Sequence, residues 1–275
     1  MIKDLIVNLG LGERDPAGEF AISIAEEYGA HVLGLAFAYE PVIPGAVMGG
    51  IPTEFIESQR SEANDKAKAA IARFEEAARR TGVSYEHRIL NASLSGAADQ
   101  LGRLGRRFDL VVVGQPERDE AIPEEVIDEA ALFESGRPVI FVPFIQRDGI
   151  KLDRVMMCWD GSRAATRAIA DSLPLINRAK QIEVVIIGNG PAKSGEVPGA
   201  DLGAHLARHK LKVDVKRITA PDIDVASTIL SYAADSSADL IVMGGYGHSR
   251  LREFVLGGAT RGILESMTVP VLMSH

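Results

Sequence analysis

The chain has 275 residues, of which 46% are hydrophobic and 25% are charged. This composition is ordinary for a folded globular protein and argues against a disordered chain, a fibre or a small disulfide scaffold. At roughly 150 residues per domain the length predicts about two domains, and the formal charge of −8 disfavours nucleic acid as a partner.

Cysteine content and hydropathy bear on where the protein works. The one cysteine, Cys158, excludes an internal disulfide, which favours a reducing compartment. Lys3 and Asp4 stand where a signal peptide would place its apolar segment. No apolar run approaches the roughly 18 residues of a membrane span. We therefore expect a cytoplasmic protein that uses neither a membrane nor nucleic acid as a partner.

Apolar runs in the first half of the chain predict five strands, and the segments between them have helical periodicity. These strands are expected at 3–9, 31–37, 84–90, 108–114 and 138–143. Residues 63–80 predict an Ala-, Glu- and Arg-rich helix of high propensity. The Pro- and Gly-containing stretch 41–52 predicts a loop. It belongs to an insertion, 41–59, whose role the sequence leaves open.

The second half repeats this pattern, as the similar runs Phe108–Gly114 and Ala238–Gly244 illustrate. Its strands are expected at 153–159, 182–188, 212–218, 239–244 and 269–274. Ser162 is placed to cap a helix that follows the first of them. Strands that alternate with helices at this spacing predict a doubly wound parallel α/β sheet, built twice. The expected domains are 1–146 and 150–275.

Candidate ligand-binding residues in the second copy follow its first and fourth strands, where open α/β sheets bind ligands. Asp160 comes directly after the first strand, and its carboxylate suits ribose hydroxyls or a base N–H. Gly244, Gly247 and Gly257 form a G-x2-G-x9-G pattern that opens the last helix. Glycines let backbone N–H groups approach an anion, and a helix N-terminus adds free donors. In a chain with 27 glycines, the alternative is a tight strand–helix connection without a ligand.

These residues, with the terminal Val269-Pro270-Val271-Leu272, resemble the universal stress protein family, as a tandem of two such domains. The resemblance implies two flavodoxin-like (adenine nucleotide alpha hydrolase-like) five-stranded sheets, paired within the chain through 138–142 and 270–273 as antiparallel strands. It also implies ATP, with or without Mg²⁺, in the second domain. Asp160 would meet adenosine, Ile187 adenine, and the glycines with their neighbours the ribose and phosphates. The implied binding residues are Asp160, Ile187, Met243, Gly244, Gly247, Gly257, Gly258 and Ala259.

One departure from the family pattern keeps two functions open. The ATP-binding branch has Ser or Thr where this chain has Gly258, so a phosphate-binding hydroxyl is missing unless Thr260 replaces it. The first hypothesis is a stress-response module in which ATP is a regulatory ligand read by an unknown protein partner. It predicts no catalytic residue and at most slow ATP hydrolysis. The alternative is a scaffold or interaction protein of the same fold without nucleotide, and a homodimer is compatible with either.

The first copy lacks the features that suit a nucleotide. Its first strand ends in Asn8-Leu9-Gly10, without the aspartate, and its fourth in Gly114-Gln115-Pro116-Glu117, without the second glycine. We therefore expect no nucleotide there, and an ordinary turn at Gly10–Gly12. His205 and His209 are spaced as a metal pair but lack an evident third ligand, so a solvated helix face is the favoured interpretation. Cys158 is expected to pack in the core.

Overall fold

The computed structural model describes residues 1–41, 52–115, 125–188, 199–219, 224–245 and 258–275. Contacts divide the chain into two compact units, Ile2–Arg137 and Pro138–His275, the second of which includes Met1. Within the described ranges, no helix has both the length and the apolar character that crossing a membrane requires. Much of the predicted loop at 41–52 lies outside the described residues.

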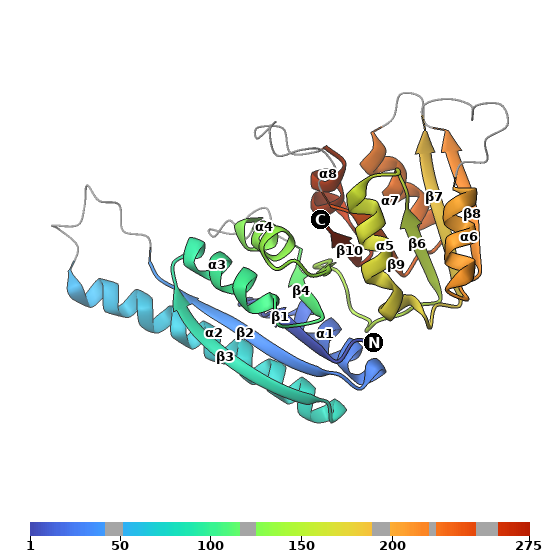
Figure 1. Ribbon diagram of the computed structural model, residues 1–275. Helices are drawn as coiled ribbons and strands as arrows, with labels where there is room; N and C mark the ends of the chain where they lie inside the picture. Colours follow the sequence, from blue (N-terminus) through green and yellow to red (C-terminus); the bar gives the residue numbers. More distant parts are fainter. Residues whose placement is uncertain (42–51, 116–124, 189–198, 220–223, 246–257) are drawn as a thin grey trace. The chain divides into compact units, whose positions relative to one another are not determined.

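The first unit is a parallel sheet with helices on both faces (Figure 1). Its strands are β1 (Asp4–Asn8), β2 (His31–Tyr39), β3 (Ser84–Ala92) and β4 (Leu110–Gly114), in the order β3-β2-β1-β4. Helices α1 (Pro16–Tyr28) and α2 (Thr53–Thr81) contact each other, as do α3 (Leu94–Gly105) and α4 (Glu125–Glu134). Strands β1 and β4 are almost wholly buried, as their apolar sequences require.

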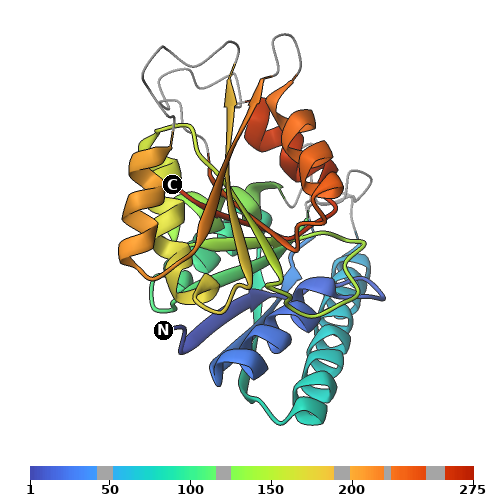
Figure 2. The same ribbon diagram turned by 90° about the vertical axis from the view of Figure 1, so that its right-hand side faces the viewer.

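The second unit contains six strands in the order β5-β10-β9-β6-β7-β8. The strands are β5 (Val139–Val142), β6 (Arg154–Cys158), β7 (Gln181–Gly188), β8 (Val213–Thr219), β9 (Leu240–Gly244) and β10 (Val271–Ser274). The helices are α5 (Arg163–Ile176), α6 (Ala200–Arg208), α7 (Val225–Asp235) and α8 (Gly258–Ser266). Helices α5 and α6 cover one face and α7 and α8 the other (Figure 2).

The predicted fold class is confirmed, since every predicted strand has a counterpart within three residues at either end. The expected antiparallel contact also forms: Phe141 of β5 pairs with Val271 of β10, and Val139 with Met273. Ser162 caps α5 by accepting the N–H of Ala165. The boundaries 1–146 and 150–275 stay a prediction about folding units; contacts place β5 with the second unit. Strands β6 and β9 are direct neighbours, so strand order reverses between them.

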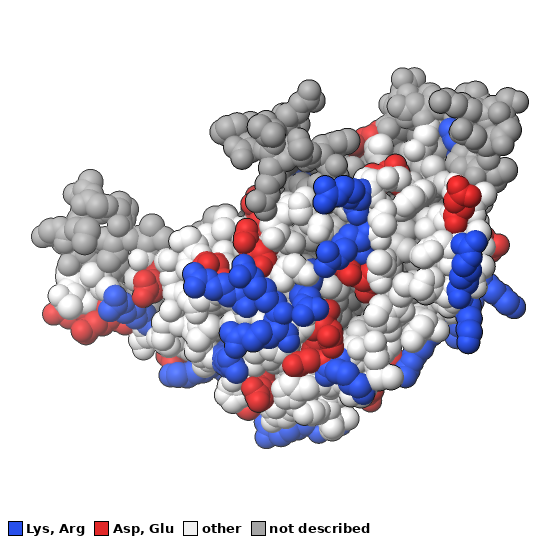
Figure 3. Space-filling view, in the orientation of Figure 1, with Lys and Arg blue, Asp and Glu red and all other residues white. Residues whose placement is uncertain are grey.

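Charged side chains of both signs cover the exposed side of α3 and α4 (Figure 3). Arg103 forms an ion pair with Asp99 on the same helix, and Arg106 lies 3.8 Å from Glu134. Each of these side chains is more than half exposed, so solvent screens both pairs and they contribute little to stability. The basic side chains Arg103 and Arg106 are thus each accompanied by an acidic group.

The turn after β1 ends in a partly buried helix cap. The carboxylate of Asp15 accepts the N–H of Gly18 at 3.0 Å, and Pro16 begins α1. Arg73 of α2 closes the turn by donating to the carbonyl of Gly12 at 2.7 Å. These contacts describe an ordinary helix start, as the sequence predicts for this turn. Burial raises the pKa of Asp15 to about 6, against the lowering effects of the Gly18 and Gly10 N–H groups and of Arg73.

This cap makes stability depend on pH. The folded protein holds the Asp15 proton more tightly than the unfolded chain, whose carboxyl has the ordinary pKa of 3.8. The free energy of unfolding contributed by this group therefore falls as the pH rises from about 4 to about 6. Asn keeps the cap without titrating, so Asp15→Asn should gain roughly 2 kcal/mol over the wild type across that range. Urea unfolding of both proteins from pH 4 to 7 measures this difference. Parallel curves would show that Asp15 titrates normally.

Candidate functional site

A cavity of about 320 Å³ opens at the carboxyl ends of β6 and β9. It lies where strand order reverses, which is the usual ligand position in open α/β sheets. Its walls come from the ends of β6, β7 and β9 and from the first turns of α5, α7 and α8. The volume lies near the lower end of the roughly 300–1,000 Å³ that small-molecule sites occupy.

Six of the eight predicted binding residues line this one cavity. They are Asp160, Ile187, Met243, Gly244, Gly258 and Ala259. Gly247 and Gly257 lie outside the described residues. The two strand ends converge because β6 and β9 are neighbours. Thr260, considered from the sequence as a replacement hydroxyl, also lines the cavity and is only 4% exposed.

Part of the apolar wall was not identified from the sequence. It includes Val185 of β7 and two residues of α7, Val225 and Ile229. Val185 lies two residues before Ile187 and therefore on the same face of the strand, so the period-two pattern could have revealed it. No comparable local signal exists for Val225 and Ile229, because only the crossover from β8 to β9 brings α7 over the sheet.

Asp160 is held in place by the turn that it begins. Its Oδ1 accepts the N–H of Ser162 at 2.8 Å, and Gly161 between them has a φ of 78°. Oδ2 has no hydrogen-bond partner among the described residues. Asp160 is therefore both a turn residue and a carboxylate with one oxygen available at the mouth of the cavity. Such an oxygen accepts hydroxyl or N–H donors from a ligand.

Gly244 has a packing role apart from any ligand. A Cβ at this position would lie 2.5 Å from the backbone N of Ala165 and 2.6 Å from the carbonyl carbon of Ala164. Only glycine therefore lets β9 approach the first turn of α5 so closely. This observation supports the alternative interpretation of the glycine pattern, a tight strand–helix contact, at this one position.

Gly258 has no such steric requirement. It begins α8, and a Cβ there would meet no described atom within 4 Å. The first N–H groups of a helix have no intrahelical partner and carry the positive end of the helix dipole. The cavity thus combines a carboxylate at one end of its wall with the first described turn of α8 at another.

Cys158 lies in the cavity wall at the end of β6. Burial, together with the nearby charge of Asp160, raises the pKa of this thiol to about 12. The sulfur therefore stays protonated at neutral pH and acts as a small apolar wall group rather than as a nucleophile.

The histidine pair elsewhere in this unit, His205 and His209, has its ring centroids 4.8 Å apart. Within the described ranges, no third metal-ligating side chain joins them.

Comparison with known proteins identifies relatives of the second half of the chain. Residues 151–275 match the model of the universal stress protein family. A universal stress protein of Synechocystis sp. is 27% identical over 124 residues, which make up 44% of this chain and 42% of that protein. The chain thus spans less than half the length of this relative.

Solved structures extend the likeness to the whole chain. A universal stress protein from Archaeoglobus fulgidus superposes with a TM-score of 0.73 at 15% identity, covering 98% of this chain and 94% of that one. A putative universal stress protein from Pseudomonas aeruginosa gives a TM-score of 0.59 at 15% identity, covering 98% and 92%. At these identities the likeness establishes the fold alone.

Proposed function

We propose that residues 151–275, which match the model of the universal stress protein family, form a domain that binds ATP as a regulatory ligand. The observation that carries the proposal is that six of the residues named from the sequence line one cavity at the switch point of the sheet. Residues at both ends of that set, Asp160 and Gly258, offer the two kinds of group that a nucleotide needs. ATP occupancy would then change a surface that a protein partner reads.

The chemistry of the wall supports a nucleotide over a simple anion. The free oxygen of Asp160 accepts hydrogen bonds from ribose hydroxyls or from an adenine N–H. The apolar side chains of Val185, Ile187 and Ile229 provide a surface for a flat base. The N-terminus of α8 favours phosphate oxygens. A bare phosphate would use only the last of these three features.

The first unit has different groups at the corresponding strand ends. Gly10 lies two residues after β1, where Asp160 lies two residues after β6, and Gln115, which is 5% exposed, follows Gly114 of β4. We therefore propose that only the second copy of the repeat binds ATP. The alternative, a scaffold without nucleotide, draws its support from the packing role of Gly244 and from the missing hydroxyl at Gly258.

Removing the Asp160 carboxylate tests the proposal. We expect Asp160→Ala to weaken Mg-ATP binding about tenfold or more, because a hydrogen bond to a charged group contributes roughly 1.5–3 kcal/mol. Calorimetric titration of the full chain measures the dissociation constants. Asp153→Ala is the control: its carboxylate lies at the other end of β6 in an exposed pair with Lys180, so its loss should leave ATP affinity unchanged. Equal affinities of both variants and the wild type would exclude Asp160 from the site.

A further inference from the structure

A second hollow, of about 290 Å³, lies at the opposite end of the same sheet face. Side chains two residues apart on a strand share a face. Met156 therefore faces the same way as Cys158, and Glu183 the same way as Val185 and Ile187. Helix α7 lies between the two hollows, since its Ile229 lines the first and its Tyr232 the second. The polar residues that line the second hollow include Arg154, Gln181, Glu183, Lys216, Tyr232 and Asp235.

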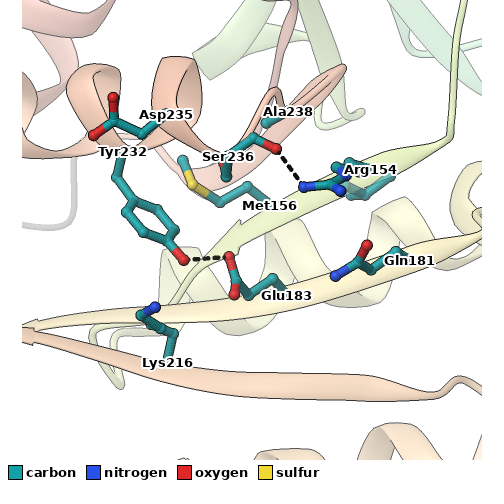
Figure 4. Close-up of a pocket in the computed structure, with 10 residues that line it drawn as sticks. Arg154, Met156, Gln181, Glu183, Lys216, Tyr232, Asp235, Ser236 and Ala238 are labelled. Atoms are coloured by element: carbon teal, nitrogen blue, oxygen red, sulfur yellow. Dashed lines mark hydrogen bonds between the residues drawn. The ribbon is translucent and has the colours of Figure 1, made fainter.

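A tyrosine–carboxylate pair spans this hollow (Figure 4). The Tyr232 hydroxyl donates to Oε2 of Glu183 at 2.8 Å. Burial and the neighbouring Glu183 raise the pKa of Tyr232 to about 12, so the hydroxyl remains a donor throughout the physiological range. The pair joins β7 to the last turns of α7. The second oxygen, Oε1 of Glu183, has no partner among the described residues and can accept a further hydrogen bond.

An ammonium group lies over the tyrosine ring. Nζ of Lys216, on β8, is 5.5 Å from the ring centroid of Tyr232. Within the part of the chain that the structure describes, Lys216 forms no ion pair with a carboxylate. Arg154 also lines the hollow, where its Nη1 donates to the carbonyl of Ser236 at 2.9 Å (Figure 4). Lys216 is the cation that lies against the tyrosine ring, beside the Tyr232–Glu183 pair.

The two opposite charges are placed for a ligand that carries both. Glu183 pairs in register with Asp214, and Lys216 stands two residues further along β8. The Cα atoms of Glu183 and Lys216 are thus diagonal neighbours on adjacent strands, roughly 8 Å apart. The side chains do not form a direct ion pair, and a compact molecule between them can contact both.

We propose that this hollow binds a small zwitterion of the free amino acid class. Its ammonium group would donate to Oε1 of Glu183, and its carboxylate would accept from the ammonium of Lys216. The apolar side chains of Met156 and Ala238 provide a wall for an aliphatic side chain. A hollow near 300 Å³ is at the small end of ligand sites and fits a molecule of this size. The site is separate from the cavity proposed for ATP.

Matched probes test the ligand class. L-Leucine carries both charges, isopentylamine lacks only its carboxylate, and 4-methylpentanoate lacks only its ammonium group. In calorimetric titrations of the full chain at pH 7, L-leucine should bind saturably. Each of the other two should bind about tenfold or more weakly, because each loses one charge-assisted hydrogen bond. No saturable L-leucine binding up to millimolar concentrations would overturn the proposal. Equal binding of isopentylamine would also overturn it, by showing a cation site instead.

Two variants test the residues. Glu183→Gln and Lys216→Gln should each weaken L-leucine binding about tenfold or more. Asp201→Asn is the control, because Asp201 lies on α6 at the other face of the sheet. The affinity of this variant for L-leucine should equal that of the wild type. Thermal unfolding of every variant checks that the fold is intact. Lys216 is exposed, so Lys216→Gln is expected to fold. The proposal can therefore still be tested with this variant if Glu183→Gln unfolds. Wild-type affinity in both variants would place the ligand elsewhere.

Discussion

Gly244→Ala is expected to lower the free energy of unfolding by about 3 kcal/mol, the upper part of the range for overpacked sites. The added Cβ would lie 2.5 Å and 2.6 Å from backbone atoms of Ala165 and Ala164. Backbone cannot turn aside as the end of a flexible side chain can, so β9 must move away from the first turn of α5. Urea unfolding of the full chain, with the transition of the second unit followed by the fluorescence of Trp159, measures the loss.

The repeat supplies a matched control for this prediction. Gly114 ends β4 as Gly244 ends β9, yet among the described residues a Cβ there would meet only the Cβ of Ala17, at 4.0 Å. Gly114→Ala should therefore change the free energy of unfolding by less than about 0.5 kcal/mol. Equal losses in the two variants would mean that glycine is needed at both strand ends for a reason other than this steric contact.

Gly258→Ser is expected to tighten Mg-ATP binding about tenfold. The resemblance to the ATP-binding branch of the family places a Ser or Thr hydroxyl at this position, and a Cβ there meets no described atom within 4 Å. A hydroxyl at the N-terminus of α8 would donate to a phosphate oxygen, and such a bond to a charged group contributes roughly 1.5–3 kcal/mol. Calorimetric dissociation constants of the variant and the wild type measure the gain.

Gly258→Ala distinguishes the effect of the serine hydroxyl on ATP affinity from the effect of the carbon that carries it. Alanine adds the same carbon without a donor and gives a similar gain in helix propensity, so its ATP affinity should stay near that of the wild type. If the Ser and Ala variants bind ATP equally well, the hydroxyl does not reach a phosphate, and the departure from the family pattern has no bearing on affinity.

Much of the fold could be predicted from the local pattern of apolar residues in the sequence. Near-continuous apolar runs such as Val111–Val113 and Ile241–Met243 identify buried parallel strands, and their alternation with helices leaves few topologies. The pairing of β5 with β10 was also expected, but on the family resemblance rather than on pattern. Nothing in the composition of 138–142 distinguishes an antiparallel partner from a parallel one.

The candidate site was predictable where it depends on strand ends and hidden where it depends on long-range packing. Asp160 and Gly244 follow neighbouring strands, so a general rule for α/β sheets brings them together. The steric role of Gly244 was not visible, because it depends on how closely α5 approaches β9. Tyr232 and Glu183 are 49 residues apart, and only the crossing of α7 over β7 makes them a pair.

The stoichiometry of Mg-ATP binding tests the central claim most directly. Calorimetric titration of the full chain, purified free of nucleotide, gives the number of sites without any substitution. A nucleotide site in the second copy of the repeat and none in the first predicts one ATP per chain. Two ATP molecules per chain would contradict the proposal that only the second copy binds ATP. No heat of binding up to millimolar Mg-ATP would contradict the account as a whole and favour an interaction protein that uses this fold without a nucleotide.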